Sequence, residues 1–268
     1  MKEIGLQLFS VRDHFQSEDE IYATLPKIKE MGYSYVQFSG AYDCISAENL
    51  AKASKNADLP VCCTHYPWDK IQDDVENTIK RHQLLGTNYI GIGGMPAAAK
   101  ESLEKLNEFI DKFNEIANTY YARGFKLLYH HHSFEFKKLD DGKTIFEHLV
   151  KKLDPQKTGF IFDTYWAQHG GQNVTDLIRR LGNRIAIMHL KDFEAAHIYN
   201  LENGKKLSAP CITRVGDGVL DFKDIIKVSE EVGIKYFVVE DDNAVEVGDS
   251  LLAVKKSYDY IRNNLFDK

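Results

Sequence analysis

The sequence predicts an α/β fold, a single (β/α)8 TIM barrel that takes in residues 1–268 as one domain. Short apolar segments alternate eight times with amphipathic ones, about one pair in every 33 residues. The apolar segments carry hydrophobic side chains at consecutive positions, as do strands of a parallel sheet covered by helices. The first of them is followed by FSVRDHF, which lacks the glycine-rich phosphate loop of a doubly wound nucleotide-binding sheet.

The apolar segments predict short buried strands, because they are rich in Val, Ile, Phe and Tyr and are bounded by polar residues or Gly. They comprise residues 4–9, 35–38, 60–65, 89–92, a run that starts at Lys126, 158–162, 185–190 and 236–239.

The intervening segments have apolar residues at helical spacing. Ser17 and Glu20 form a capping-box pattern at the start of the first, and Gly32 is a typical stop signal after it. A long polar connection, residues 191–220, follows the seventh strand, and we expect it to lie over the mouth of the barrel. The predicted helices comprise residues 17–31, 47–56, 69–85, 103–123, 143–152, 174–181, 222–232 and 247–264.

Composition narrows the possible functions. The chain has 268 residues, 43% of them hydrophobic, and a formal net charge of −6. Nucleic acid and anionic membrane surfaces require clustered basic charge, so neither is expected as a partner. The start of the sequence has no pattern of a secretion signal, and no apolar run is long enough to span a membrane. With no disulfide framework or zinc-ligand spacing among its four cysteines, the chain is expected to be cytoplasmic.

The fifth strand leads into three consecutive histidines, in the stretch KLLYHHHSFEF. Successive side chains of a strand point to opposite faces, so His130 and His132 share one face while His131 points away. A buried His131 would need a hydrogen-bond partner. Two imidazoles on one face, with Glu135 three residues on, favour a metal or proton-transfer site.

Other strands also end in side chains that can bind metal ions. In a barrel of this type the active site forms where strands end, so these side chains should converge at one mouth. Imidazoles and carboxylates without thiolates suit Mn²⁺ or Mg²⁺ first, and Zn²⁺ or Co²⁺ second. The alternative is structural: Asp163 caps a helix, and Glu240 belongs to a solvated acidic turn. The candidate residues are His65, His130, His132, Asp163, His189 and Glu240.

Four motifs carry a resemblance to a known family. FIFDTYW around Asp163, MHLKDF around His189, FVVEDD around Glu240 and the loop VGDGVLDF resemble the sugar phosphate isomerase/epimerase superfamily, the xylose isomerase-like TIM barrels. The resemblance extends over nearly the whole chain. It implies a divalent metal held by a Glu on strand five, an Asp on strand six, a His on strand seven and a Glu on strand eight. The last three correspond to Asp163, His189 and Glu240.

Strand five departs from that pattern. The position of the family's Glu falls on His130, and YHHHSFEF resembles a subgroup with a Tyr-His-x-His strand five. His130 is therefore the first choice for the fourth ligand. His132 is the alternative, or a proton-transfer group, and Glu135 is the third candidate if the loop folds back.

Several further residues are candidates for substrate contact. Gln7 and His65 suit sugar hydroxyl groups. Trp68 and Trp166 could form an apolar wall against a sugar ring, or could pack in the core. Arg214 in the long loop could hold a phosphate or hydroxyl groups, or could be a solvated cation.

The resemblance implies a metal-dependent isomerase or epimerase that abstracts a proton next to a carbonyl in a small sugar, sugar derivative or cyclitol. Glu240 or His132 would move the proton, and Lys191, on the face of His189, could hold a substrate oxygen. Because the strand-five carboxylate is missing, a lyase or hydratase on a keto-sugar or keto-glycoside is the rival, and a non-catalytic sugar-binding module is a second alternative. A metal-dependent phosphodiesterase is disfavoured, because it would need a basic surface and the formal net charge is −6. The expected partner is a small carbohydrate. The sequence is also compatible with a homo-oligomer.

Overall fold

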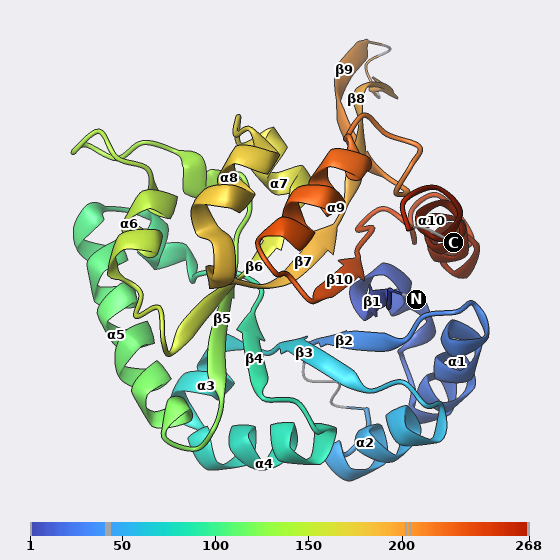
Figure 1. Cartoon of the computed structure of the whole chain (residues 1–268), viewed down its shortest axis with the longest axis horizontal. Helices are drawn as coiled ribbons and strands as arrows, with labels where there is room; N and C mark the ends of the chain where they lie inside the picture. The colour runs from blue at the N-terminus through green and yellow to red at the C-terminus, as the bar shows by residue number, and fades with distance from the viewer. Residues whose placement is uncertain (1, 41–43, 202, 204, 267–268) are drawn as a thin grey trace.

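The structure, a computed structural model, describes residues 2–40, 44–201, 203 and 205–266. Eight parallel strands close into a barrel in which the strands follow one another in chain order, so the predicted (β/α)8 barrel is confirmed (Figure 1). The barrel strands are β1 (Gly5–Gln7), β2 (Tyr35–Ser39), β3 (Val61–His65), β4 (Tyr89–Ile92), β5 (Lys126–His130), β6 (Thr158–Asp163), β7 (Ile185–Leu190) and β10 (Tyr236–Val239).

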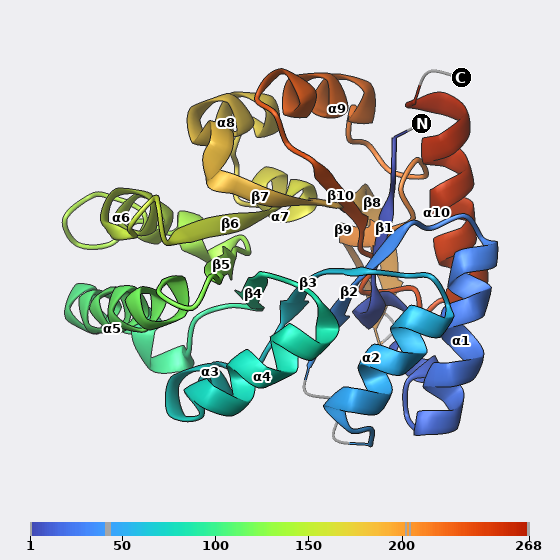
Figure 2. The ribbon, with the colours of Figure 1, turned by 60° about the horizontal axis from the view of Figure 1, so that its bottom comes forward.

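Helices cover the outer surface of the barrel, as Figure 2 shows. The predicted capping box begins the first of them: Glu20 N donates to Ser17 Oγ, and Ser17 N donates to the Glu20 carboxylate. The helices are α1 (Glu18–Glu30), α2 (Ala47–Asn56), α3 (Trp68–Asp73), α4 (Val75–Leu85), α5 (Leu103–Tyr121), α6 (Ile145–Lys152), α7 (Thr164–His169), α8 (Val174–Leu181), α9 (Phe222–Glu231) and α10 (Ser250–Asn264). Short 3₁₀ segments are η1 (Leu8–His14), η2 (Ala97–Lys100), η3 (Phe134–Phe136) and η4 (Gly182–Arg184).

The prediction of one helix over residues 69–85 is wrong. The segment is divided into α3 and α4 at Asp74, whose backbone has φ −135° and ψ 62°. Carbonyl groups at the end of α3 are satisfied from outside the helix: Tyr120 Oη donates to Ile71 O (2.8 Å), and Thr78 Oγ1 donates to Lys70 O (3.1 Å). The break therefore leaves few backbone groups unsatisfied, and one of the two donors, Tyr120, is distant in the sequence.

The first strand is shorter than predicted. It ends at Gln7, because the Gln7 side chain accepts a hydrogen bond from Phe9 N (2.9 Å) and starts η1 there. Residues 8 and 9 therefore belong to a 3₁₀ turn at the end of the barrel.

The connection 191–220 contains an antiparallel hairpin, β8 (Asp192–Asn200) and β9 (Lys206–Thr213), in place of the expected cover over the mouth. Figure 1 shows the hairpin projecting away from the barrel. Most described residues beyond Phe193 in β8 are exposed, and none of the hairpin residues lines the cavity at the barrel mouth. The strand signal missed in the sequence is the Ile198–Tyr199 pair, which opposes Ser208 and Leu207.

The inside of the barrel has two layers that follow from the two-residue period of the strands. The layer nearer the amino-terminal ends of the strands is apolar. Each of its inward side chains is followed two residues later by a polar side chain at the carboxyl end of the strand. This pattern pairs Leu128 with His130, Ile161 with Asp163, Ile187 with His189 and Val238 with Glu240.

His82 shows how the helical layer holds a neutral imidazole. Its Nδ1–H donates to Thr78 O (2.7 Å), and its Nε2 accepts from Thr64 Oγ1 (2.8 Å). Burial lowers the pKa of His82 to about 4. Since the unfolded chain takes up this proton near pH 6.5, the His82 contribution to stability is lost as the pH falls from about 6.5 to about 4.

We therefore expect His82→Gln to flatten the pH dependence of the free energy of unfolding between pH 6.5 and 4. The wild type should lose on the order of 3 kcal/mol more than the variant over this range. Urea titrations of both proteins at several pH values measure the difference. Parallel pH profiles for the two proteins would show that His82 does not remain neutral in the folded state.

Across the part of the chain that the structure describes, no helix has both the length and the apolar composition that crossing a bilayer requires.

Candidate metal centre

Four side chains from four adjacent strands meet at the carboxyl end of the barrel. His130 ends β5, Asp163 ends β6, His189 lies in β7 and Glu240 follows β10. All four are buried. Each offers one ligand atom, and these atoms lie within 4.8 Å of one another. The convergence predicted from strand ends is thus present, and His130 is the strand-five residue of the group.

The spacing of these atoms fits a metal ion. His130 Nε2 lies 3.6 Å from Asp163 Oδ2 and 4.0 Å from Glu240 Oε2. His189 Nδ1 lies 2.7 Å from Glu240 Oε2 and 3.9 Å from Asp163 Oδ2. Bonds of about 2.1 Å to one ion place tetrahedral ligands roughly 3.4 Å apart. All four atoms are buried, and none forms a hydrogen bond of standard geometry among the described residues, although Lys191 Nζ lies beside both carboxylate oxygens. Such an arrangement is compatible with metal ligands.

The remaining polar atoms of the ligands are held by neighbours. His130 Nδ1 contacts Gly93 O (3.5 Å), and His189 Nε2 contacts Gln37 Oε1 (2.7 Å). Both acceptors place the proton on the nitrogen that faces them, which leaves His130 Nε2 and His189 Nδ1 with free lone pairs. The sequence reasoning missed Gln37, although it is the one amide in the otherwise apolar predicted strand 35–38.

Asp163 serves two purposes through different oxygens. Its Oδ1 accepts from Trp166 N (2.8 Å) and caps α7, while Oδ2 faces the other ligand atoms. Asp163 therefore caps a helix through Oδ1, as the structural alternative expected. Its Oδ2 remains available to bind a metal ion. Its backbone N donates to His131 Nε2 (3.2 Å), which supplies the partner expected for that buried imidazole.

Lys191 brings a buried cation to the same place. Its Nζ lies 2.8 Å from Glu240 Oε2, 3.2 Å from Asp163 Oδ2 and 3.0 Å from Asp242 Oδ2. Burial opposes the charge, but the three carboxylates raise the pKa of Lys191 well above its usual value. Burial likewise opposes the charge on Glu240, yet Lys191 and His189 hold the pKa of this carboxyl well below its usual range. The acidic turn is thus largely buried rather than solvated.

A cavity of about 340 Å³ opens beside these groups, a volume suited to a small molecule. Of the predicted site residues, His65, His130, His132, Lys191 and Glu240 line it. Phe9 and Asp242 line it too and were not predicted to do so. The full lining is Phe9, Ser39, Gly40, His65, Tyr66, Pro67, Gly93, His130, His132, Lys191, Glu240 and Asp242.

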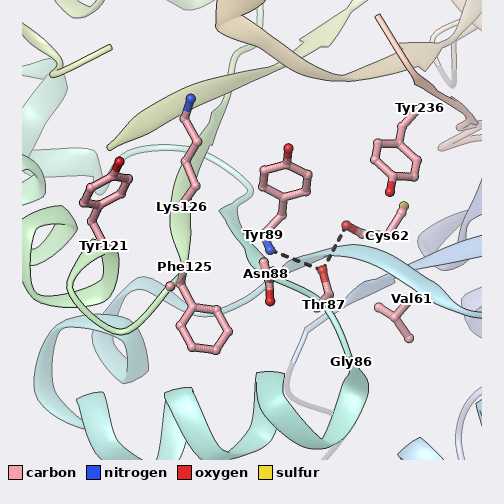
Figure 3. Close-up of a pocket in the computed structure, with 11 residues that line it drawn as sticks. Val61, Cys62, Gly86, Thr87, Asn88, Tyr89, Tyr121, Phe125, Lys126 and Tyr236 are labelled. Carbon is pink, nitrogen blue, oxygen red and sulfur yellow. Dashed lines mark hydrogen bonds between the residues drawn. The ribbon is translucent and has the colours of Figure 1, made fainter. Parts of the chain in front are cut away.

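A second cavity, of about 680 Å³, lies at the opposite end of the barrel, where β3, β4, β5 and β10 begin (Figure 3). Tyr89, Lys126 and Tyr236 contribute to its wall. None of the residues that line it carries a carboxylate or an imidazole. The smaller cavity is therefore the better candidate for catalysis, because it alone of the two adjoins the cluster of ligand atoms.

The two candidate tryptophans have different environments. The Trp68 ring stacks on Phe113 with centroids 5.6 Å apart and planes 7° apart, so Trp68 packs against α5 and does not line the cavity at the mouth. Trp166 lies 5.2 Å from the His132 ring, and Lys191 Nζ lies 5.4 Å from the Trp166 ring centroid. Trp166 does not line the cavity either, but its ring lies beside two residues that do, so it is the better candidate for contact with a ring of the substrate.

Two other candidates lie outside the cluster. Glu135 accepts hydrogen bonds from Tyr129 Oη (2.6 Å) and His132 N (2.8 Å), so its carboxyl group holds the turn after β5 and is not among the converging ligand atoms. Burial raises the pKa of Glu135 to about 7 despite these bonds. Arg214 forms an ion pair with Asp217 and does not line the cavity.

The glycine-rich loop after the hairpin is held by Asp192. This carboxylate accepts from Gly216 N (3.0 Å), Gly218 N (3.1 Å) and Leu220 N (3.2 Å). A side chain at Gly218 would overlap Asp192, which explains the glycine. The motif therefore shapes the connection beyond β7 and does not reach the cavity.

We expect Gln37→Met to weaken metal binding by about 10–100-fold, because the amide orients the His189 ring. A competition titration of the metal-free protein with a chromophoric chelator measures this change. Gln156→Met, at an exposed turn position, is the control and should bind normally. Equal affinity in the two variants would show that Gln37 does not orient the ligand.

Comparison with known proteins agrees with this architecture. A sequence profile of the xylose isomerase-like TIM barrel family matches residues 25–264. An inosose dehydratase of Geobacillus thermodenitrificans is 26% identical over 166 residues, which cover 59% of this chain and 54% of that protein. One of Mesomycoplasma hyopneumoniae is 27% identical over 193 residues, covering 68% and 61%. The matched segments thus span less than two thirds of either relative.

A solved structure shares the fold over the whole chain. The sugar phosphate isomerase/epimerase of Parabacteroides distasonis superposes with a TM-score of 0.82 at 23% identity, covering 100% of this chain and 96% of that one.

Proposed function

The chain belongs to the xylose isomerase-like TIM barrel family, and we propose that it is a divalent-metal-dependent dehydratase of a small keto-sugar or cyclitol ketone. The reaction removes a proton from the carbon next to a carbonyl group and expels the hydroxyl group of the following carbon. A carbon–carbon double bond forms, and the proton and the hydroxyl leave as water. The names of the two dehydratase relatives support this class of reaction.

Elimination is chosen over epimerisation because of one observation. The strand-five corner of the cluster is an imidazole, His130, where the family pattern has a second glutamate. Paired glutamates suit epimerisation, because one removes the proton and the other returns it on the opposite face. With a single metal-site glutamate, Glu240, the return step loses its partner, whereas elimination needs one base and stabilisation of the departing hydroxyl.

The proposed ligands are His130, Asp163, His189 and Glu240. A bound Mn²⁺ or Mg²⁺, or alternatively Zn²⁺ or Co²⁺, would supply Lewis-acid polarisation of the carbonyl oxygen.

Two groups can handle protons in the cavity. His132 lines it and has a buried, unpartnered Nδ1, so it is the proposed base along with Glu240. The Lys191 ammonium, buried beside three carboxylates, is placed to hold a developing oxyanion or the departing hydroxyl group. His65 is proposed to contact a substrate hydroxyl, and Trp166 to lie against the ring. Gln7 is buried and does not line the cavity, so it is proposed to act through His65 rather than by direct contact.

Epimerisation or isomerisation is the second candidate. It is favoured by the positions of His132 after β5 and Glu240 after β10, which are not neighbours in the barrel. Two proton-handling groups from separated strands could act on opposite faces of a substrate carbon.

Incubation of the metal-loaded protein in D₂O with inososes, ketoses and 3-keto-glucosides distinguishes the candidates. A dehydratase yields a product lighter by one water with the absorbance of a conjugated carbonyl. An epimerase yields a product of equal covalent composition that has gained deuterium. If neither product nor exchange appears in the whole set, the enzymatic proposal is wrong and a binding module is favoured.

A further inference from the structure

We propose that Gln7 fixes His65 as a neutral imidazole whose Nε2–H points into the cavity and donates to a substrate oxygen, and that His65 is not a metal ligand. Hydrogen bonds alone place the proton on His65, whereas the role of this proton toward the substrate rests on the proposed function.

The orientation of the Gln7 amide is set by the backbone. Phe9 N donates to Gln7 Oε1 (2.9 Å), so the amide oxygen faces η1. The amide nitrogen is then the atom that faces His65 Nδ1, at 3.1 Å. Because an amide NH₂ group can only donate, Nδ1 must be the acceptor, and the ring proton must be on Nε2. Gln7 is fully buried, so solvent offers no alternative partner.

This proton decides between two roles for His65. The ligand atoms of His65, His130 and His189 are close enough to hold a metal ion as a three-imidazole group. A neutral imidazole binds metal only through a nitrogen with a free lone pair. Nδ1 of His65 is engaged by Gln7, and Nε2 carries the proton, so His65 lacks such a nitrogen. His130 and His189 face carbonyl acceptors instead and present free lone pairs.

The Nε2–H of His65 has no acceptor within the described protein. The nitrogen is buried and unpartnered, although the residue lines the cavity and its ring centroid lies 4.8 Å from that of His130. A buried donor without an acceptor carries a desolvation cost that a bound ligand can recover. The hydroxyl and carbonyl oxygens of a polyhydroxylated ketone supply the acceptor. Gln7 is thus a positioning residue.

The tautomer can be read by long-range ¹H–¹⁵N spectra of histidine-labelled protein loaded with diamagnetic Zn²⁺ or Mg²⁺. Loss of one signal set in His65→Gln assigns the ring. We expect the proton on Nε2 in the wild type and on Nδ1 in Gln7→Glu, whose carboxylate accepts where the amide donates. A proton on Nδ1 in the wild type, or an unchanged tautomer in Gln7→Glu, overturns the proposal.

Metal affinity provides a second, substrate-free readout. His65→Gln should bind the metal ion within about threefold of the wild type, since no ligand is removed. A loss comparable to that of a ligand variant would show that His65 is a ligand and would overturn the proposal.

The substrate role is tested with whichever compound turns over. His65→Leu should raise KM about tenfold, as expected for loss of one buried hydrogen bond, while His65→Gln, which keeps an N–H donor, should recover most of this loss. Equal KM values in the two variants would overturn the substrate role. Because the tautomer and metal readouts need no turnover, failure of the proposed function would leave them intact and would be recognised separately.

Discussion

Replacing His189 with alanine should abolish stoichiometric metal binding. The substitution removes one of two nitrogen ligands and leaves Glu240 Oε2 without the atom 2.7 Å away. Wild-type protein should carry near one divalent ion per chain after dialysis, and His189→Ala should carry almost none by elemental analysis. The barrel should persist, because the apolar layer below the cluster is unchanged.

The matched control is His197→Ala, a partly exposed histidine on the hairpin that should leave the metal content as in the wild type. Circular dichroism of both variants checks that folding is retained. Wild-type metal content in His189→Ala would mean that the ligand assignment is wrong.

Lys191→Met should reduce turnover by roughly 10²–10³-fold, the usual effect of removing one preorganised electrostatic contact. Metal binding should be retained or strengthened, because Asp163 and Glu240 lose the cation that competes for their oxygens. Steady-state kinetics with saturating metal, together with a metal titration, separates the two effects.

Lys126→Met is the control for this substitution. Lys126 lines the cavity at the other end of the barrel, so its replacement should change neither turnover nor metal affinity. If Lys191→Met lost metal as His189→Ala does, Lys191 would be needed for assembly of the centre rather than for the reaction.

The cluster could be predicted from sequence because it depends on local rules. Strand ends meet at one mouth, and the two-residue period carries His130, Asp163 and His189 inward. Gln37 and Asp242 were missed, because their roles depend on which side chains face them across the closed barrel. Gln37 reaches His189 from β2, and Asp242 reaches Lys191 from the turn after β10.

Other differences arise from contacts between distant segments. The break at Asp74 is stabilised by Tyr120 of α5, which donates to the carbonyl of Ile71 from 49 residues away. Trp68 and Trp166 both follow barrel strands, so their different environments could not be predicted from the sequence. The aromatic surface of α5 takes the first into packing, and the cap at Asp163 directs α7, with the second, toward the mouth.

The apolar layer inside the barrel has a consequence for proton traffic. Leu128, Ile161, Ile187 and Val238 are all fully buried and form an apolar layer between the two ends. These four side chains offer no hydrogen-bonding group between the large cavity at the amino-terminal end and the cluster of ligand atoms. We therefore expect protons that the reaction takes from its substrate to enter and leave through the mouth that the substrate itself occupies. Exchange of the abstracted proton with solvent should therefore be slow while a molecule is bound and fast once it departs. The rate of isotope uptake should then depend on how long the molecule stays in the site.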